Sequence, residues 1–287
     1  MKLRNFLIIL LLIPAALAAR DDKRCLWRVT GGESEVYMLG SIHAADSSFY
    51  PLDDVIMRAY DSSDALAVEF NVAKINPLEL MQKAVFQDDR TLESQLPDST
   101  YRLLDSLLSQ MGMPANIYNK FKPWFAAITA AQIIISEMEL NFDMGIDVYF
   151  LDLAKRDSLD ILELESLDEQ VNMLESQVTK NIDAFIRSTV ADLAGADSMM
   201  LDMARAWKCG DTAAIRRIQY AWTEDYPEYE DIYNALVIER NRNMVQKIER
   251  YAKSGRRIFV VVGVGHLVGE QSIPCLLRRR GYQVEQL

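Results

Sequence analysis

The chain has 287 residues, half of them hydrophobic, and its 31 Lys and Arg against 42 Asp and Glu give a formal net charge of −11. This length suffices for one large domain or two small domains with a hydrophobic core. Because so acidic a chain shows no basic stripe that could neutralise phosphates, we expect no nucleic-acid partner. The three cysteines are too few for a disulfide scaffold.

The N-terminus has the features of a secretory signal peptide. Lys2 and Arg4 precede an apolar run over residues 6–13, and Ala16-Leu17-Ala18 has the small-x-small pattern of a cleavage site. We therefore expect residues 1–18 to be removed and the protein to be exported, either to the periplasm or as a secreted protein. No stable membrane span is expected after cleavage, because no other segment has the about 18 uninterrupted apolar residues that a span needs. A retained signal anchor is the alternative.

Both ends of the chain have the pattern of β-strands. Alternating or continuous apolar runs predict strands, and the Gly31-Gly32 turn between the first two indicates a hairpin. The predicted strands are 26–30, 35–39, 65–70, 258–262 and 282–285, with helices at 51–60 and 271–279. Each end is thus a strand, a GxxH sequence, a helix and a strand. The crossover helices imply strands that are at least locally parallel.

The middle of the chain is dominated by helical periodicity, with one strand expected at 159–165. The predicted helices are 91–111, 122–140, 145–156, 167–194, 199–208, 212–221 and 231–252. We predict an α/β (α+β) fold, in which two β-GxxH-α-β units at the chain ends form a central mixed sheet. Residues 19–287 are expected to form a single domain, with sheet-forming ends at about 25–76 and 255–287 and a mainly helical insertion at about 77–254.

The two histidines of the chain, His43 and His266, occupy matching positions. Each lies three residues after a glycine, Gly40 or Gly263, that follows an apolar strand. A single histidine at the end of a strand is usually a hydrogen-bonded turn or core residue, but the repetition favours one shared site. We expect the glycines to permit a tight or left-handed turn that directs each imidazole over the strand end.

Glu69 lies at the end of the strand predicted over 65–70 and could complete a set of two histidines and one carboxylate. Such a set suits a catalytic divalent ion, namely zinc, manganese, cobalt or iron. Glu69 would act there as a ligand or as the general base. A carboxylate at a strand end can equally be solvated or cap a helix.

Four further residues are candidates for supporting roles. Glu165 ends the strand predicted over 159–165, although it could lie on a surface turn instead. Arg240 and Asn241 belong to the helix that precedes the second histidine strand, where an arginine could bind a substrate carboxylate, orient Glu69, or simply be solvated. Ser41 lies beside the first histidine, but the G-x-S-x-G elbow of a serine nucleophile is absent from this segment.

These segments together resemble the TraB/GumN family, which is related to the Tiki proteases. The resemblance runs from about residue 26 to the end and is carried by residues 37–43, 67–69, Gly145-Ile146-Asp147 with Phe150 and Ala154, 164–166 with Glu169-Gln170, 239–241 and 263–269. It implies a metal-dependent, peptidase-like fold whose active site holds the two GxxH histidines and Glu69. It also implies a peptide or secreted-protein substrate, since Tiki relatives are manganese- or cobalt-dependent proteases that act near the N-termini of secreted proteins.

Two other functions stay open at this stage. The fold is distantly similar to erythromycin esterases, which implies a metal-independent hydrolase with histidine as the general base. The wider superfamily also resembles an iron-regulated heme-binding lipoprotein, which implies a non-enzymatic heme- or ligand-binding protein. Where the TraB/GumN family often has an acidic residue two positions after the glutamate, this chain has Asn71.

The cysteines allow one disulfide bond in an exported protein. Cys25 and Cys275 lie near the two histidine segments, and they are the expected pair if a bridge forms. An unpaired buried thiol is the alternative.

Overall fold

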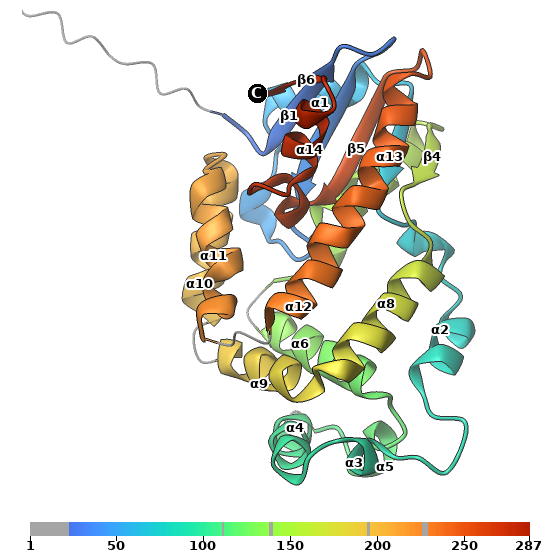
Figure 1. The fold of residues 1–287 in the computed structure, drawn as a ribbon, viewed down its shortest axis with the longest axis vertical. Helices are drawn as coiled ribbons and strands as arrows, with labels where there is room; N and C mark the ends of the chain where they lie inside the picture. Colours follow the sequence, from blue (N-terminus) through green and yellow to red (C-terminus); the bar gives the residue numbers. More distant parts are fainter. Residues whose placement is uncertain (1–22, 111, 138–139, 194–195, 226–228) are drawn as a thin grey trace, which may run out of the picture.

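The computed structural model describes residues 23–110, 112–137, 140–193, 196–225 and 229–287, so the predicted signal segment 1–18 lies outside the described residues. Six strands form one mixed sheet in the order β4-β3-β5-β2-β1-β6 (Figure 1). Their bounds are β1 (Leu26–Thr30), β2 (Val36–Ser41), β3 (Ala65–Val68), β4 (Asp160–Glu163), β5 (Ile258–Gly263) and β6 (Gln283–Gln286). The predicted α/β class with a mixed sheet is therefore confirmed.

The two strands that precede the histidines are neighbours in this sheet. β2 pairs with β5 in parallel, with Ser41 opposite Gly263, and β3 and β4 continue the parallel part on the other side of β5. β1 pairs antiparallel with both β2 and β6. The connection from β2 to β3 thus passes over β5, and that from β5 to β6 passes over β2 and β1. This interleaving of the chain ends brings the two GxxH sequences to the same edge.

The connection from β2 to β3 contains α1 (Asp54–Asp61), and the one from β5 to β6 contains α14 (Ile273–Arg279). Both begin at a residue whose side chain accepts a backbone N–H, Asp53 and Ser272 respectively. The helices between β3 and β5 are α2 (Pro77–Ala84), α3 (Leu92–Gln95), α4 (Asp98–Gln110), α5 (Ala115–Tyr118), α6 (Pro123–Glu137), α7 (Ile146–Arg156), α8 (Leu167–Lys180), α9 (Ile182–Leu193), α10 (Ala196–Lys208), α11 (Thr212–Asp225), α12 (Tyr229–Tyr233) and α13 (Arg240–Ala252).

Two of the predicted helices are each two helices in the structure. The helix expected over 91–111 is interrupted between α3 and α4, because Leu96 precedes Pro97 and adopts an extended backbone. The helix expected over 167–194 is interrupted at Asn181, a residue type that disfavours helix interiors. The helix expected over 231–252 is continuous, but its segment Asn234–Glu239 is π-helical.

The largest core cluster surrounds the sheet. Tyr60 of α1, Phe150 of α7 and Phe259 of β5 pack together, with ring centroids 4.9 Å apart for the two phenylalanines. α13 contributes Met244 and Val245, both fully buried. A second cluster lies among the helices at the end of the molecule away from the sheet (Figure 1), and it includes Leu92, Leu104, Leu108 and Tyr118. The sheet is therefore held rigid by a packed core, and its carboxyl edge is a rigid base for side chains.

The described cysteines are free thiols, so the expected Cys25–Cys275 pair is not formed. Cys25 is buried, and its thiol faces the backbone oxygen of Trp207 at 3.5 Å. Burial raises the pKa of Cys25 to about 12. Cys25 packs in the core cluster, and its thiol contacts the backbone of α10 rather than another cysteine.

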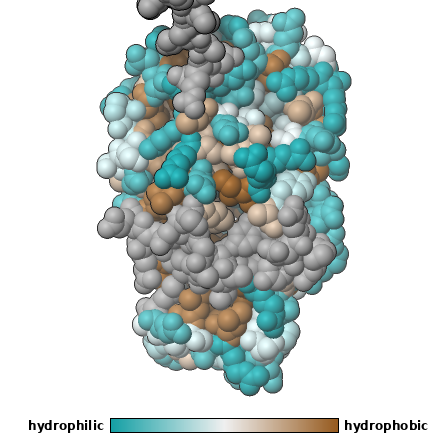
Figure 2. All heavy atoms as spheres, turned by 90° about the vertical axis from the view of Figure 1, so that its left-hand side faces the viewer, coloured by the Kyte–Doolittle hydropathy of each residue, from teal (hydrophilic) through white to brown (hydrophobic). Residues whose placement is uncertain are grey.

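In the described residues, no helix is both long enough and apolar enough to cross a membrane. The face shown in Figure 2 is mostly hydrophilic over the sheet end, with smaller hydrophobic spots between the polar residues.

Candidate active site

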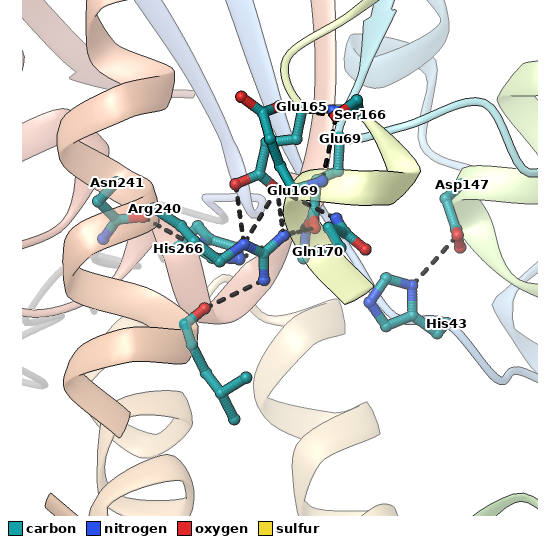
Figure 3. A network of polar contacts seen from close by, with 12 residues as sticks. His43, Glu69, Asp147, Glu165, Ser166, Glu169, Gln170, Arg240, Asn241 and His266 are labelled. Atoms are coloured by element: carbon teal, nitrogen blue, oxygen red, sulfur yellow. Dashed lines mark hydrogen bonds and ion pairs between the residues drawn. The ribbon is translucent and has the colours of Figure 1, made fainter. Parts of the chain in front are cut away.

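Four proposed site segments meet at one edge of the sheet. β4, β3, β5 and β2 are consecutive parallel strands, so their carboxyl ends lie side by side. Glu165, Glu69, His266 and His43 follow these strands in that order. The carboxyl edge of parallel strands is where α/β sheets usually place their binding sites. Figure 3 shows His43 with Asp147 on one side of Glu69, and His266 with Asn241 and Arg240 on the other.

Asp147 fixes the orientation of His43. The Nδ1 atom of His43 lies 3.1 Å from Oδ2 of Asp147, which is at the start of α7. Because a carboxylate only accepts, Nδ1 must carry the proton and donate it. α7 is held against the histidine loop by the bond from Ile146 N–H to the Ile42 oxygen. A Cβ at Gly145 would lie 2.3 Å from the backbone oxygen of His43, so only glycine permits this approach.

His266 is oriented by Asn241 in an equivalent way. The Nδ2 group of Asn241 donates to the Gln271 oxygen at 2.9 Å, which leaves its Oδ1 facing His266 Nδ1 at 2.7 Å. Nδ1 therefore donates to the amide oxygen, and Nε2 keeps its lone pair. Both Asn241 and His266 are buried. In the neutral form of each imidazole, Nε2 is therefore the atom available to a ligand.

Glu69 lies between the two histidines and is held at both oxygens. Its Oε1 accepts the backbone N–H of Gly263 at 2.6 Å, and Oε2 accepts from Nη2 of Arg240 at 2.5 Å. Oε1 is 3.8 Å from Nε2 of His266. Arg240 also donates to both oxygens of Glu165, which receives a further bond from Gln170. The arginine therefore bridges two buried carboxylates and fixes the position of Glu69.

The π-helical segment Asn234–Glu239 directly precedes Arg240. The Nη1 group of Arg240 donates to the Leu236 oxygen within this segment at 3.0 Å. Such wide turns are rare and often occur at functional sites. Here the π-helical turns precede two consecutive residues that serve different partners, since Arg240 contacts the carboxylates and Asn241 contacts His266.

Burial and neighbouring charges shift the pKa values of the three proposed ligands in different directions. Burial opposes the ionisation of Glu69, but the charges of His266, Arg240 and His43 and the Gly263 N–H outweigh it and lower the pKa of Glu69 to about 2. Burial also lowers the pKa of His266 to about 4, despite the nearby Glu69. Desolvation lowers the pKa of His43, but the hydrogen bond to Asp147 and the charges of Asp147 and Glu69 prevail and raise it to about 9.

Two imidazoles and one carboxylate are chemically suitable ligands for a divalent ion. A Cβ built on Gly263 would have as its nearest atoms Oε1 of Glu69 at 3.3 Å, Nε2 of His43 at 3.5 Å and Cδ2 of His266 at 3.7 Å. The three side chains therefore converge on a space that only a glycine leaves open. Within the part of the chain that the structure describes, no three His, Cys, Asp or Glu side chains are already arranged as a metal-binding group. Ligands of one ion are roughly 3–3.5 Å apart, so Glu69 and His266 would have to approach by a few tenths of an ångström.

A cavity of about 510 Å³ opens beside His43 and Glu69. Its walls come from the ends of β2 and β3 and from α6, α7 and α9. Most of its lining is apolar, including Phe70, Val72, Ile128, Ala131, Ile135 and Leu151. A larger cavity of about 680 Å³ between α14, β6 and the segment before β1 contains none of the proposed site residues. The smaller cavity therefore gives a ligand access to His43 and Glu69.

Several predicted details differ in the structure. Gly40 and Gly263 do not adopt positive φ, so of the expected tight or left-handed turn the left-handed form is absent at both positions. Gly40 is required for packing instead, because a Cβ there would lie 2.7 Å from Cγ2 of Val264. Ser41 is buried next to the cavity, and its hydroxyl has no hydrogen-bond partner among the described residues. Asn71 caps the short helix Val72–Lys74 by accepting the Ala73 N–H.

Three residues of the site were not predicted as members of it, namely Asp147, Gln170 and Gln271. Asp147 and Gln170 lie in segments that carry the family resemblance, so the resemblance offered a signal for both. Gln271 contributes only its backbone oxygen, which no sequence pattern indicates.

The fold and the site define a mixed α/β protein in which two GxxH histidines and a glutamate meet at the carboxyl edge of parallel strands. The chain belongs to the TraB/PrgY/gumN family, whose model matches residues 25–286.

Similar proteins are named only as uncharacterized. The chain is 24% identical over 258 residues to the uncharacterized protein YbaP of Escherichia coli (strain K12), which covers 86% of this chain and 89% of that protein. It is 21% identical over 286 residues to an uncharacterized protein of Treponema pallidum (strain Nichols), which covers 93% of this chain and 83% of that protein. No solved structure matches the chain.

Proposed function

We propose that the protein is a metal-dependent hydrolase, and specifically a peptidase, with His43, His266 and Glu69 as ligands of a divalent ion. The observation that carries this proposal is the convergence of the three side chains on the open space at Gly263. Manganese, cobalt, zinc and iron all accept two imidazoles and one carboxylate. Such an ion, when bound, would supply Lewis acidity for the attack of water on a carbonyl group.

The residues around the proposed ligands each have a definite task. Asp147 and Asn241 hold the Nδ1 protons of the two histidines, so that Nε2 is the free nitrogen of each neutral ring, and Nε2 of His43 and Cδ2 of His266 lie beside Gly263. Arg240 and the Gly263 N–H hold the Glu69 carboxylate in its ionised form between the histidines. Glu69 would serve as a ligand or as the base that accepts a proton from water.

Metal-dependent peptide hydrolysis tests this proposal. Chelator-treated protein is given Mn²⁺, Co²⁺, Zn²⁺ or Fe²⁺, and a mixed peptide pool is followed by mass spectrometry. We expect cleavage that requires the ion and that falls on the order of 100-fold or more in Glu69→Gln. Glu163→Gln is the matched control, because this partly exposed carboxylate of β4 binds Lys74 and the Asn71 N–H. Cleavage that is equal in the two variants, or absent with every ion, contradicts the proposal.

A second candidate function is hydrolysis without a metal, with His43 as the general base at a pH near or above its raised pKa of about 9. The contact between His43 and Asp147 favours it, because a carboxylate on Nδ1 typically orients a basic histidine. In the same experiment, cleavage that persists in chelator but is lost in His43→Ala would select this candidate. We also propose export, to the periplasm or beyond, on the basis of the signal-like pattern of residues 1–18.

A further inference from the structure

The cavity beside the histidines has the size and lining of a binding subsite. Its volume of about 510 Å³ lies within the roughly 300–1,000 Å³ of ligand pockets. Apolar side chains from β3, α6 and α7 form most of the wall, and His43 and Glu69 are also among the lining residues. An apolar group in the cavity would therefore be next to the proposed reacting centre.

The polar groups around the cavity indicate what else the ligand must carry. The Ser41 side chain is only 2% exposed, and its hydroxyl has no partner among the described residues. Oδ1 of Asp147 is likewise without a partner there, while Oδ2 faces His43. A carboxylate oxygen can only accept, so it calls for a ligand with an N–H donor. A peptide has such donors beside its side chains, whereas an acyl chain has none.

The charges of the lining argue against an anionic ligand. Asp143 and Asp147 line the cavity together with Glu69, and no Lys or Arg is among its described lining residues. Asp143 is exposed and forms no salt bridge with another described residue. A fatty-acid carboxylate or an acidic peptide would meet these three carboxylates, and the imidazole of His43 is the one cationic group among the described lining residues.

We propose that this cavity is a specificity subsite that takes apolar side chains of a peptide whose flanking residues are not acidic. The inference rests on the proposed peptidase function and names the substrate class of that site. Apolar burial supplies the affinity, while the peptide N–H and carbonyl groups serve Asp147 and Ser41. A peptide with polar central residues lacks the apolar burial and therefore binds more weakly. An acidic peptide is repelled by Asp143.

Peptide binding to the chelator-treated full chain tests the proposal without requiring hydrolysis. The probes are acetylated and amidated tetrapeptides with a Leu-Phe centre or a Ser-Asn centre, a Leu-Phe peptide flanked by aspartates, and laurate. Calorimetry should show that the neutral Leu-Phe peptide binds at least roughly tenfold more tightly than the other three. Laurate that binds as tightly as this peptide would overturn the assignment in favour of an acyl site.

Ala131→Trp fills the cavity from α6 and should weaken the neutral peptide at least roughly tenfold, whereas Ala213→Trp, an exposed position on α11, should leave its affinity unchanged. Val72→Lys places a cation in the lining at a side chain that is 37% exposed, so folding should be preserved. This variant should improve binding of the aspartate-flanked peptide. The proposal would be overturned if Ala131→Trp bound the neutral peptide as tightly as the wild type does and Val72→Lys bound the aspartate-flanked peptide no better than the wild type does. If the peptides bind as expected but no metal-dependent cleavage is found, the subsite is retained and only the proposed peptidase function is rejected.

Discussion

Replacing Arg240 by leucine is expected to lower the free energy of unfolding by about 3–5 kcal/mol. The guanidinium bridges Glu69 and Glu165, whose side chains are only 12% and 7% exposed. Without it, two carboxylates remain close together in a buried setting, where desolvation and mutual repulsion both destabilise the folded protein. Urea unfolding followed by circular dichroism measures the loss.

Arg256, in the bend just before β5, provides the control for this effect because its ion pair is more exposed. Arg256 pairs with Asp160 at 2.8 Å, but the two side chains are 42% and 69% exposed. Arg256→Leu should therefore cost less than about 1 kcal/mol. Adding Glu165→Gln to Arg240→Leu should recover part of the loss, because it removes one of the two unpaired charges. Equal small losses for both arginines would show that the buried bridge does not hold Glu69 in place.

Replacing Gly263 by alanine is expected to weaken metal binding strongly with little effect on folding. The φ and ψ of −49° and 134° are allowed for any residue, so stability should change by less than about 1 kcal/mol. The added methyl group would occupy the space shared by Glu69, His43 and His266. Displaced ligands should weaken metal affinity roughly 100-fold, the scale at which disturbed ligand orientation acts. Titration with Mn²⁺ or Zn²⁺ measures the change.

Gly265→Ala is the matched control, two residues further along the same loop. Its Cβ would meet the end of the flexible Gln219 side chain at 2.5 Å, which can move aside. Metal affinity should therefore stay within a few-fold of the wild type. A Gly263→Ala protein that binds metal as tightly as Gly265→Ala would place the ion elsewhere.

The strands and the histidine pair were predictable because they depend on local patterns. Continuous apolar runs marked β2, β3 and β5, and the repeated GxxH placed His43 and His266 at strand ends. The interleaved strand order was not predictable, because pairing of β2 with β5 joins segments more than 200 residues apart. The helix expected over 91–111 is interrupted in the structure, because Pro97 favours an extended backbone at Leu96.

The proposed ligands were predicted, but most of what orients them was not. Arg240 had been considered as a residue that orients Glu69, and its hydrogen bond to Oε2 agrees with that interpretation. The contact between Asp147 and His43 depends on the approach of α7 to the histidine loop at Gly145. The contact between Asn241 and His266 depends on how the π-helical turn aligns α13. Both are tertiary effects without a local pattern in the sequence.

The most direct test of the account is the metal content of the protein, purified without chelator and without a histidine tag. Elemental analysis should find about one equivalent of manganese, cobalt, zinc or iron per chain, bound as purified or after reconstitution. The His43→Ala/His266→Ala double variant, shown to be folded by its circular dichroism, should hold almost none. An equal metal content in the two proteins, or none in the reconstituted wild type, would contradict a metal centre at the paired histidines.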